Sequence, residues 1–216
     1  MSQSGLTDRT AFNRKIERGS HDREEAHAIL DAARVGHLGY TLDGQPYVLP
    51  IAFGRDGEDI LFHGSTGARS MRALAAGAAC CFTVTHVDGL VLARSAFNSS
   101  MNFRSLMVLG TCAEITDPDA KWRALDAVTD HLFPERRRSL RPMTRKEVAA
   151  TMVLRLPLTE FSIKARSGGP NDDGDDVLWP VWAGELPIST SFGAAVPAAN
   201  LDERLSTPAL LSLWQA

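Results

Sequence analysis

The stretch Ile60–Leu74, ILFHGSTGARSMRAL, concentrates residue types that bind anions. It opens with apolar residues, turns through Gly64 and Gly67, and continues in a helical pattern headed by Arg69 and Ser70. The first N–H groups of a helix lack intrahelical partners, and the helix dipole favours negative charge there. This stretch is therefore suited to binding a phosphate. The same residues also suit an ordinary strand-to-helix connection, so their setting has to decide between the two.

Several common chemical motifs are missing from the chain. It has no GxSxG nucleophile elbow and no Gly-Lys-Ser/Thr phosphate loop. Gly64 and Gly67 are three residues apart, which does not match the GxGxxG pattern of dinucleotide-binding folds. The cysteines include no CxxC pair and the histidines are scattered. We therefore expect no metal site, although ligands can converge in space from distant positions.

The composition is that of an ordinary globular protein. The chain has 216 residues, of which 44% are apolar and 23% charged, enough for one domain with a real core. A net charge of -3 gives no basic field for nucleic acid. No apolar run approaches a membrane span, and the N-terminal residues lack a signal core. Cys80, Cys81 and Cys112 lie in apolar segments with a strand pattern, which favours buried thiols in a reducing cytoplasm.

Period-two patterns dominate the chain and predict an antiparallel barrel with flanking helices. Asp43-Gly44 and Asp88-Gly89 are hairpin signals, and Pro50 and Pro157 indicate an edge, a bulge or a gap. Helices are predicted over 22–33, from about 69 to 76, and over 119–132. The predicted strands cover 35–42, 46–53, 60–63, 78–86, 90–97, 104–115 and 151–164.

The C-terminal part carries weaker signals. The arginines between Arg136 and Arg145 suit a solvated connector, because no aromatic residues are interleaved with them. Residues 167–176 read as a mobile acidic loop. Trp179 and Trp182 lie close together beside prolines, which is typical of an aromatic lid or an interface. Nothing in the tail after residue 193 points to chemistry.

Three segments together resemble a known family. In order and spacing, YVLPIAF, DILFHGSTGARSMRAL and RSLMVLGTCAEI resemble the flavin-binding split barrel of the pyridoxamine 5'-phosphate oxidase superfamily. The segment KARSGGPNDDGDDVLWPVWAGELPI is most similar to the branch that contains nitroimidazole-resistance proteins. The resemblance implies a mainly β fold with flanking helices, a six-stranded antiparallel FMN-binding split β-barrel over residues 21–190. Residues 1–20 would be a flexible arm, and residues 191–216 a C-terminal extension.

The same resemblance implies where FMN binds. The family lays the backbone of its second strand along the flavin ring and holds the phosphate at the turn after the third strand. Arg104 and Ser105 fall where a second subunit reaches the flavin, which implies a homodimer, and Trp182 falls where a tryptophan often covers it. The implied cofactor-binding residues are Tyr47, Val48, Leu49, Pro50, Ile51, Ala52, His63, Gly64, Ser65, Arg69, Ser70, Arg104, Ser105 and Trp182.

Two departures from the family pattern limit the functional expectation. The oxidases have Arg-Lys at the phosphate, whereas this chain has Arg69-Ser70, which should weaken phosphate binding unless another arginine replaces the charge. The C-terminal Arg-x-His that grips pyridoxal phosphate is missing from the final residues, TPALLSLWQA. A true pyridoxamine phosphate oxidase is therefore not expected.

Three functions remain open at this point. The first is an FMN-dependent oxidoreductase acting on a small molecule, in which His63 either contacts the reacting group or has only a structural role. The second is a non-catalytic flavin- or haem-binding protein. The third is a reductase using the deazaflavin F420, whose acidic tail would need a basic groove such as Arg136–Arg145. The identity of the bound cofactor would separate these functions.

Overall fold

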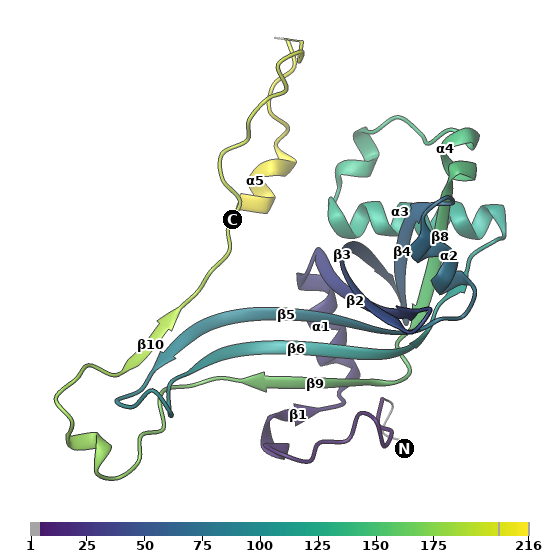
Figure 1. Ribbon diagram of the computed structural model, residues 1–216. Helices are drawn as coiled ribbons and strands as arrows, with labels where there is room; N and C mark the ends of the chain where they lie inside the picture. The colour runs from purple at the N-terminus through teal and green to yellow at the C-terminus, as the bar shows by residue number, and fades with distance from the viewer. Residues whose placement is uncertain (1–4, 203, 216) are drawn as a thin grey trace.

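A curled antiparallel sheet is the frame of the molecule, which is a computed structural model describing residues 5–202 and 204–215 (Figure 1). The strands pair in the order β1-β9-β6-β5-β2-β3-β4-β8-β7, and β10 pairs with β5. Their bounds are β1 Gly19–Ser20, β2 Val35–Leu42, β3 Gln45–Asp56, β4 Asp59–Ser65, β5 Ala79–Leu92, β6 Ser100–Thr111, β7 Ala113–Glu114, β8 Thr151–Pro157, β9 Phe161–Arg166 and β10 Gly184–Pro187.

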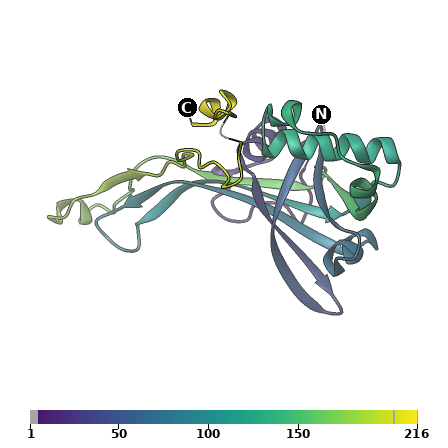
Figure 2. The ribbon, with the colours of Figure 1, turned by 90° about the horizontal axis from the view of Figure 1, so that it is seen from above.

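The pairings close a barrel at one end of this sheet. β7 follows β6 after a single residue and pairs with β8. With β6 and β7 taken as one strand, the ring runs through β2, β3, β4, β8, β6/β7 and β5, which are six strands. The expected mainly β fold with an antiparallel split barrel is confirmed. Beyond the barrel, β5, β6 and β9 continue as a long extension that ends beside β10 (Figures 1 and 2).

Short helices flank the barrel, and local capping explains where three of them begin. The Asp22 carboxylate accepts a hydrogen bond from Glu25 N, and Asp117 accepts one from Ala120 N. Thr144 and Glu147 form a capping box. The α-helices are α1 Arg23–Ala32, α2 Arg69–Ala75, α3 Pro118–Leu132, α4 Arg145–Ala150 and α5 Leu210–Gln215, and the 3-10 turns are η1 Ile16–Arg18, η2 Arg136–Ser139 and η3 Asp176–Leu178.

The hairpin predicted at Asp88-Gly89 is wrong. β5 runs through both residues to Leu92 with only a register shift, and the return strand β6 starts at Ser100. A Cβ atom on Gly89 would lie 3.0 Å from the carbonyl oxygen of Leu186 in β10. Gly89 therefore permits a close approach of two backbones rather than a turn.

The single strand predicted over residues 151–164 is also wrong. Pro157 ends β8, Leu158 N donates to the carbonyl of Glu58, and β9 starts only at Phe161. The two strands pair with different neighbours, β8 with β4 and β9 with β6. The proline thus marks the end of a strand, where no ladder donor is needed.

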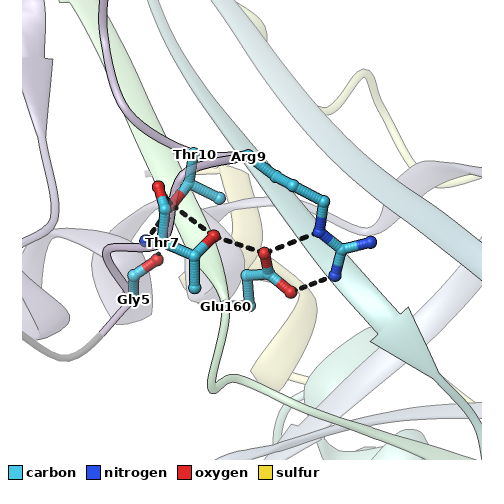
Figure 3. A network of polar contacts seen from close by, with 5 residues as sticks. All are labelled: Gly5, Thr7, Arg9, Thr10 and Glu160. Atoms are coloured by element: carbon cyan, nitrogen blue, oxygen red, sulfur yellow. Dashed lines mark hydrogen bonds and ion pairs between the residues drawn. The ribbon is translucent and has the colours of Figure 1, made fainter.

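The segment expected as a flexible N-terminal arm contacts the turn between β8 and β9 (Figure 3). Thr7 Oγ and the Arg9 guanidinium both donate to the Glu160 carboxylate, and Phe161 N donates to the carbonyl of Gly5. The division into arm, barrel domain and extension stays a prediction. The loop over residues 167–176, which was expected to be mobile, is also joined to the rest of the chain. The Asp172 carboxylate accepts hydrogen bonds from Arg94 N at 2.7 Å and from Arg94 Nη1 at 2.6 Å.

Two apolar layers surround the strand β4. Ile60 and Phe62 point into the barrel, where Phe82 packs edge-on against Phe62 at 5.1 Å. Leu61 points outward into a second layer between the barrel and α3. The outer layer consists of Leu61, Ala124, Leu125, Val128, Val148 and Val153. Residues of β4 with odd numbers therefore face α3, because side chains alternate along a strand.

The histidine that joins α3 to α1 makes folding stability depend on pH. His131 Nε2 lies 2.7 Å from the carbonyl oxygen of Ala33, and burial lowers the pKa of His131. The unfolded chain, with an ordinary pKa of about 6.5, then binds the proton more readily, so stability falls as the pH drops through that value. The loss is at most about 1.4 kcal/mol per pH unit for one proton.

We expect a lower melting temperature at about pH 5.5 than at about pH 7.5. His131→Gln keeps a donor for Ala33 but cannot titrate, so its melting temperature should change less between the two conditions. Differential scanning fluorimetry measures both. An equal drop in the two proteins would show that other groups carry the acid sensitivity.

Candidate functional site

One edge of β3 lacks a strand partner over half its length. Residues 45–52 pair with β2, but pairing with β4 begins only at Phe53, opposite Phe62. Among the described residues, no strand pairs with the other edge of Tyr47–Ala52, while β4 continues along β8 as far as Ser65. Backbone N–H and C=O groups need partners, so this edge can bind a planar ligand that has donors and acceptors of its own. Pro50 lies in this edge and has no N–H to donate.

The side chains along this edge divide between two faces. Tyr47, Leu49 and Ile51 pack against the barrel core. Val48 and Pro50 are exposed, Val48 at 67%, and Ala52 is half-buried. A ligand on the outer face would therefore contact the backbone of the whole segment and the side chains of only three residues. The expectation that this segment lays its backbone along a flavin ring stays a prediction.

The strand-to-helix turn lies beside the open edge. The Arg69 guanidinium lies 5.7 Å from the ring centroid of Tyr47 and 3.5 Å from the Asp43 carboxylate in the β2–β3 turn. Ser65 Oγ accepts from Gly67 N at 3.2 Å, which shapes the turn. Arg69 is exposed and its pair with Asp43 is long, so a stronger anion can displace Asp43. The structure thus brings β3, the end of β4 and the start of α2 together.

His63 lies on the outer face of β4, beneath α3 and α4. It lines a cavity of about 240 Å³ together with Leu125, Val128, Thr129, Leu132, Phe133, Met143, Glu147 and Thr151. Its Nδ1 is buried and has no hydrogen-bond partner within the described part of the chain. Burial lowers the pKa of His63, which keeps the imidazole neutral at pH 7. A neutral imidazole in a largely apolar cavity is a candidate metal or cofactor ligand.

The other five histidines are placed differently. Nε2 of His21 lies 3.1 Å from a backbone carbonyl, and Nε2 of His86 lies 3.0 Å from another. Nε2 of His27 is also buried without a hydrogen bond to any described residue, although it lies 3.0 Å from the Glu58 carboxylate, and His131 binds Ala33 as described above. His37 is exposed on β2. His63 therefore combines burial, a free nitrogen and a cavity in a way that the other five do not.

Arg104, Ser105 and Trp182 are not part of this group within one chain. Arg104 is on β6 and forms a bidentate pair with Asp88 at 2.8 and 3.0 Å, and that arginine lowers the pKa of Asp88. Ser105 Oγ donates to the carbonyl of Lys164. Trp182 lies between η3 and β10, beside the outer end of β5, and is 66% exposed. Figure 1 shows β10 at the opposite end of the sheet from α2.

Most of the residues around His63 were missed by sequence reasoning. Leu125, Val128 and Leu132 recur on one apolar face of the helix predicted over residues 119–132, and neither Phe133 nor Met143 carries a sequence signal for this cavity. A helical stripe shows that one face is buried but not which strand it covers. Arg72 was also missed: it follows Arg69 by one turn of α2, on the same side of the helix, whereas the second cation of the family pattern was expected at Ser70.

The basic run is largely neutralised by local acids. Arg137 pairs with Asp126 and Asp130, and Arg138 pairs with Glu135. Arg141 pairs with Glu147 and lowers the pKa of that carboxyl to about 2. Such pairing suits a solvated connector. In the described residues, no group of histidine, cysteine and acidic side chains forms a metal cluster, and no helix is long and apolar enough to cross a membrane.

Comparison with known proteins identifies the class. A family model described as pyridoxamine 5'-phosphate oxidase matches residues 22–165, about two thirds of the chain. The chain belongs to this family, whose split barrel it shares. A comparison with the curated proteins finds no significant match.

Two solved structures are similar over almost the whole chain. One is the FAD and haem binding protein from Mycobacterium smegmatis, with 38% identity, a TM-score of 0.88, and coverage of 92% of this chain and 97% of that one. The other is the flavocytochrome Anf3 from Azotobacter vinelandii, with 38% identity, a TM-score of 0.90, and coverage of 96% and 97%. A protein from Bacteroides thetaiotaomicron, named for 5-nitroimidazole antibiotic resistance, shares the fold at 24% identity and a TM-score of 0.58, with coverage of 68% and 85%.

Proposed function

We propose that this protein is an oxidoreductase that binds a flavin along the open edge of β3. The observation that carries the proposal is the unpaired edge at Tyr47–Ala52, which lies next to the Arg69 turn. An isoalloxazine ring has hydrogen-bond donors and acceptors along one side, which suit the unpaired backbone edge of β3. The ring also has a flat apolar face, which suits the exposed side chain of Val48. When bound, the flavin supplies hydride and electron transfer, and the protein supplies binding and orientation.

We further propose that the flavin is FAD rather than FMN. A terminal phosphate carries close to two negative charges at pH 7, because its second pKa is about 6. Each phosphate of a dinucleotide carries only one charge. The chain offers Arg69 followed by Ser70 where the oxidases have two cations, which suits the lower charge density. Of the two relatives with 38% identity, one is named as an FAD and haem binding protein and the other as a flavocytochrome.

A second cofactor, haem, is supported by the cavity at His63. The buried Nδ1 without a partner, the lowered pKa of His63 and the apolar residues of α3 fit a histidine that would hold haem iron. A volume of about 240 Å³ is below the usual range for cofactor sites, so only part of a haem would lie inside. Haem bound here would supply one-electron and oxygen chemistry. His63 would hold its iron, and α3 would exclude water from that face.

A homodimer would complete the flavin site. Trp182 lies near the outer end of β5, and Arg104 lies opposite His86 about midway along β5, on a strand that β5 and β2 separate from β3. The extension also exposes Leu186, Phe97 and Met101 at 54%, 92% and 49%, which favours burial against another subunit. In this arrangement Arg104 of one chain would approach the flavin of the other. Sedimentation analysis of the purified protein tests the dimer.

The cofactors can be identified directly on the purified protein. Release by heat followed by mass determination distinguishes FAD, FMN and F420, and a Soret band reports haem. Bleaching of the flavin band by NAD(P)H would support an oxidoreductase rather than a store or sensor. A protein that takes up none of FAD, FMN and F420 would refute the assignment of the open edge.

Removing the arginine at the turn should weaken flavin binding. Arg69→Ala deletes a cation beside the open edge, and a charged hydrogen bond of about 1.5–3 kcal/mol corresponds to an affinity loss of about 10- to 100-fold. Fluorescence titration of the apoprotein with FAD measures it. Arg123→Ala, an exposed arginine on α3, is the matched control and should bind FAD normally. Equal affinity in all three proteins would contradict the placement of the phosphates.

A further inference from the structure

An aromatic cluster contacts the His63 cavity through one of its lining residues, Phe133. Phe133 directly follows α3, lines the cavity, and is 47% exposed. Its ring faces that of Trp214 in α5, with centroids 6.5 Å apart and planes inclined by 28°. Trp214 also contacts Phe192, with centroids 6.0 Å apart. Two distant parts of the C-terminal segment therefore meet beside this cavity.

The same segment is anchored to the body of the protein at this point. The Arg34 guanidinium lies over the Phe192 ring, 5.1 Å from its centroid. Arg34 Nε also donates to the carbonyl of Leu132 at 3.3 Å, and Leu132 is itself a cavity residue. The anchor thus joins the end of α1, the end of α3 and the tail. Figures 1 and 2 show α5 on the side of the molecule that carries α3.

The cavity needs an outer wall that the barrel does not provide. Its inner side is formed by β4, α3 and α4, and about 240 Å³ is too little to enclose a ligand as large as haem. Such a ligand would project past Phe133, where its apolar surface would meet water unless another element covers it. Trp214 is the partly buried aromatic residue that the tail places against Phe133.

We propose that the C-terminal segment, through Trp214 and Phe192, forms the outer wall of the His63 cavity and retains the planar apolar ligand bound there. This inference rests on the proposed haem site and adds residues to it. His63 holds the ligand at its centre, and Trp214 covers the edge that leaves the cavity. The wall therefore controls how fast the ligand departs, whereas the bond to His63 is independent of it.

The test compares haemin release from variants of the full-length protein. Each protein is loaded with haemin, and transfer to excess apomyoglobin is followed by absorbance. We expect Trp214→Ala to release haemin about three- to tenfold faster than the unmodified protein, as for loss of an aromatic contact. Trp214→Phe should restore most of the slow release. Trp179→Ala, which removes an exposed tryptophan remote from this contact, should release haemin at the normal rate.

Trypsin cleavage after Arg204 gives a second readout that does not depend on activity. Arg204 is 88% exposed in the tail, and haemin should slow its cleavage in the unmodified protein but not in Trp214→Ala. If Trp214→Ala releases haemin at the rate of the unmodified protein, and haemin slows its cleavage just as much, the C-terminal segment does not form an outer wall. Haem binding at His63 would be unaffected by that result. If the unmodified protein takes up no haemin, the proposed haem site itself fails, and the wall fails with it.

Discussion

Replacing His63 by alanine is expected to abolish tight haem binding while flavin binding survives. His63 is the described histidine that combines a buried, unpartnered nitrogen with an apolar cavity. Loss of a residue that merely orients a metal ligand costs about 10- to 100-fold in affinity, so loss of the ligand itself should cost more. Haemin titration followed in the Soret region measures the loss, and FAD titration of the same variant shows that the barrel is intact.

Two controls make this result specific. His37→Ala removes an exposed histidine from β2 and should bind haemin normally. His63→Gly leaves a space that free imidazole can enter, so added imidazole should restore part of the Soret band. Haemin binding of His63→Ala at the affinity of the unmodified protein would show that another residue holds the iron, and that His63 lines the cavity for a different purpose.

The barrel could be predicted from the sequence because most of its strands and turns have local sequence signals. Alternation along Val35–Leu42 and the Asp43-Gly44 turn specify the first hairpin, and the structure has both. Asp88-Gly89 carries the same signal but lies inside β5, because β10 crosses close to Gly89. A turn dipeptide indicates only a local preference. Here that preference is overridden by pairing with β10, which begins 95 residues after Gly89.

The candidate site could be predicted only in the part that is local in the chain. The edge at Tyr47–Ala52 and the Arg69 turn are close in sequence, and the structure brings them within 5.7 Å through Tyr47. The position of His63 followed from the same stretch, but its environment did not. Tertiary packing decides which helix covers β4, so the sequence could not identify the α3 residues that line the cavity. Trp182 was expected beside the same flavin, and within one chain it lies on the far extension.

The packing of α3 on the barrel depends on Gly54, so a larger residue at this position should strongly destabilise the protein. Gly54 on β3 faces α3 so closely that a Cβ atom there would lie 2.7 Å from Val128 Cα and 3.2 Å from Val128 N. Both are backbone atoms, so no side-chain rotation relieves the contact. Gly54→Val should therefore push α3 off the sheet and lower the free energy of unfolding by about 3 kcal/mol, the upper part of the range for overpacking.

The same displacement should also damage the His63 cavity, because Val128 lines it. Urea denaturation of the apoprotein measures the stability, and haemin titration measures the cavity. Gly174→Val is the matched control, since a Cβ atom at Gly174 meets nothing within 4 Å. Gly54→Ala should give an intermediate loss of both properties. Normal haemin binding by a destabilised Gly54→Val protein would mean that α3 keeps its place over His63 and that the strain is absorbed elsewhere, which would separate the cavity from the packing of α3 against β3.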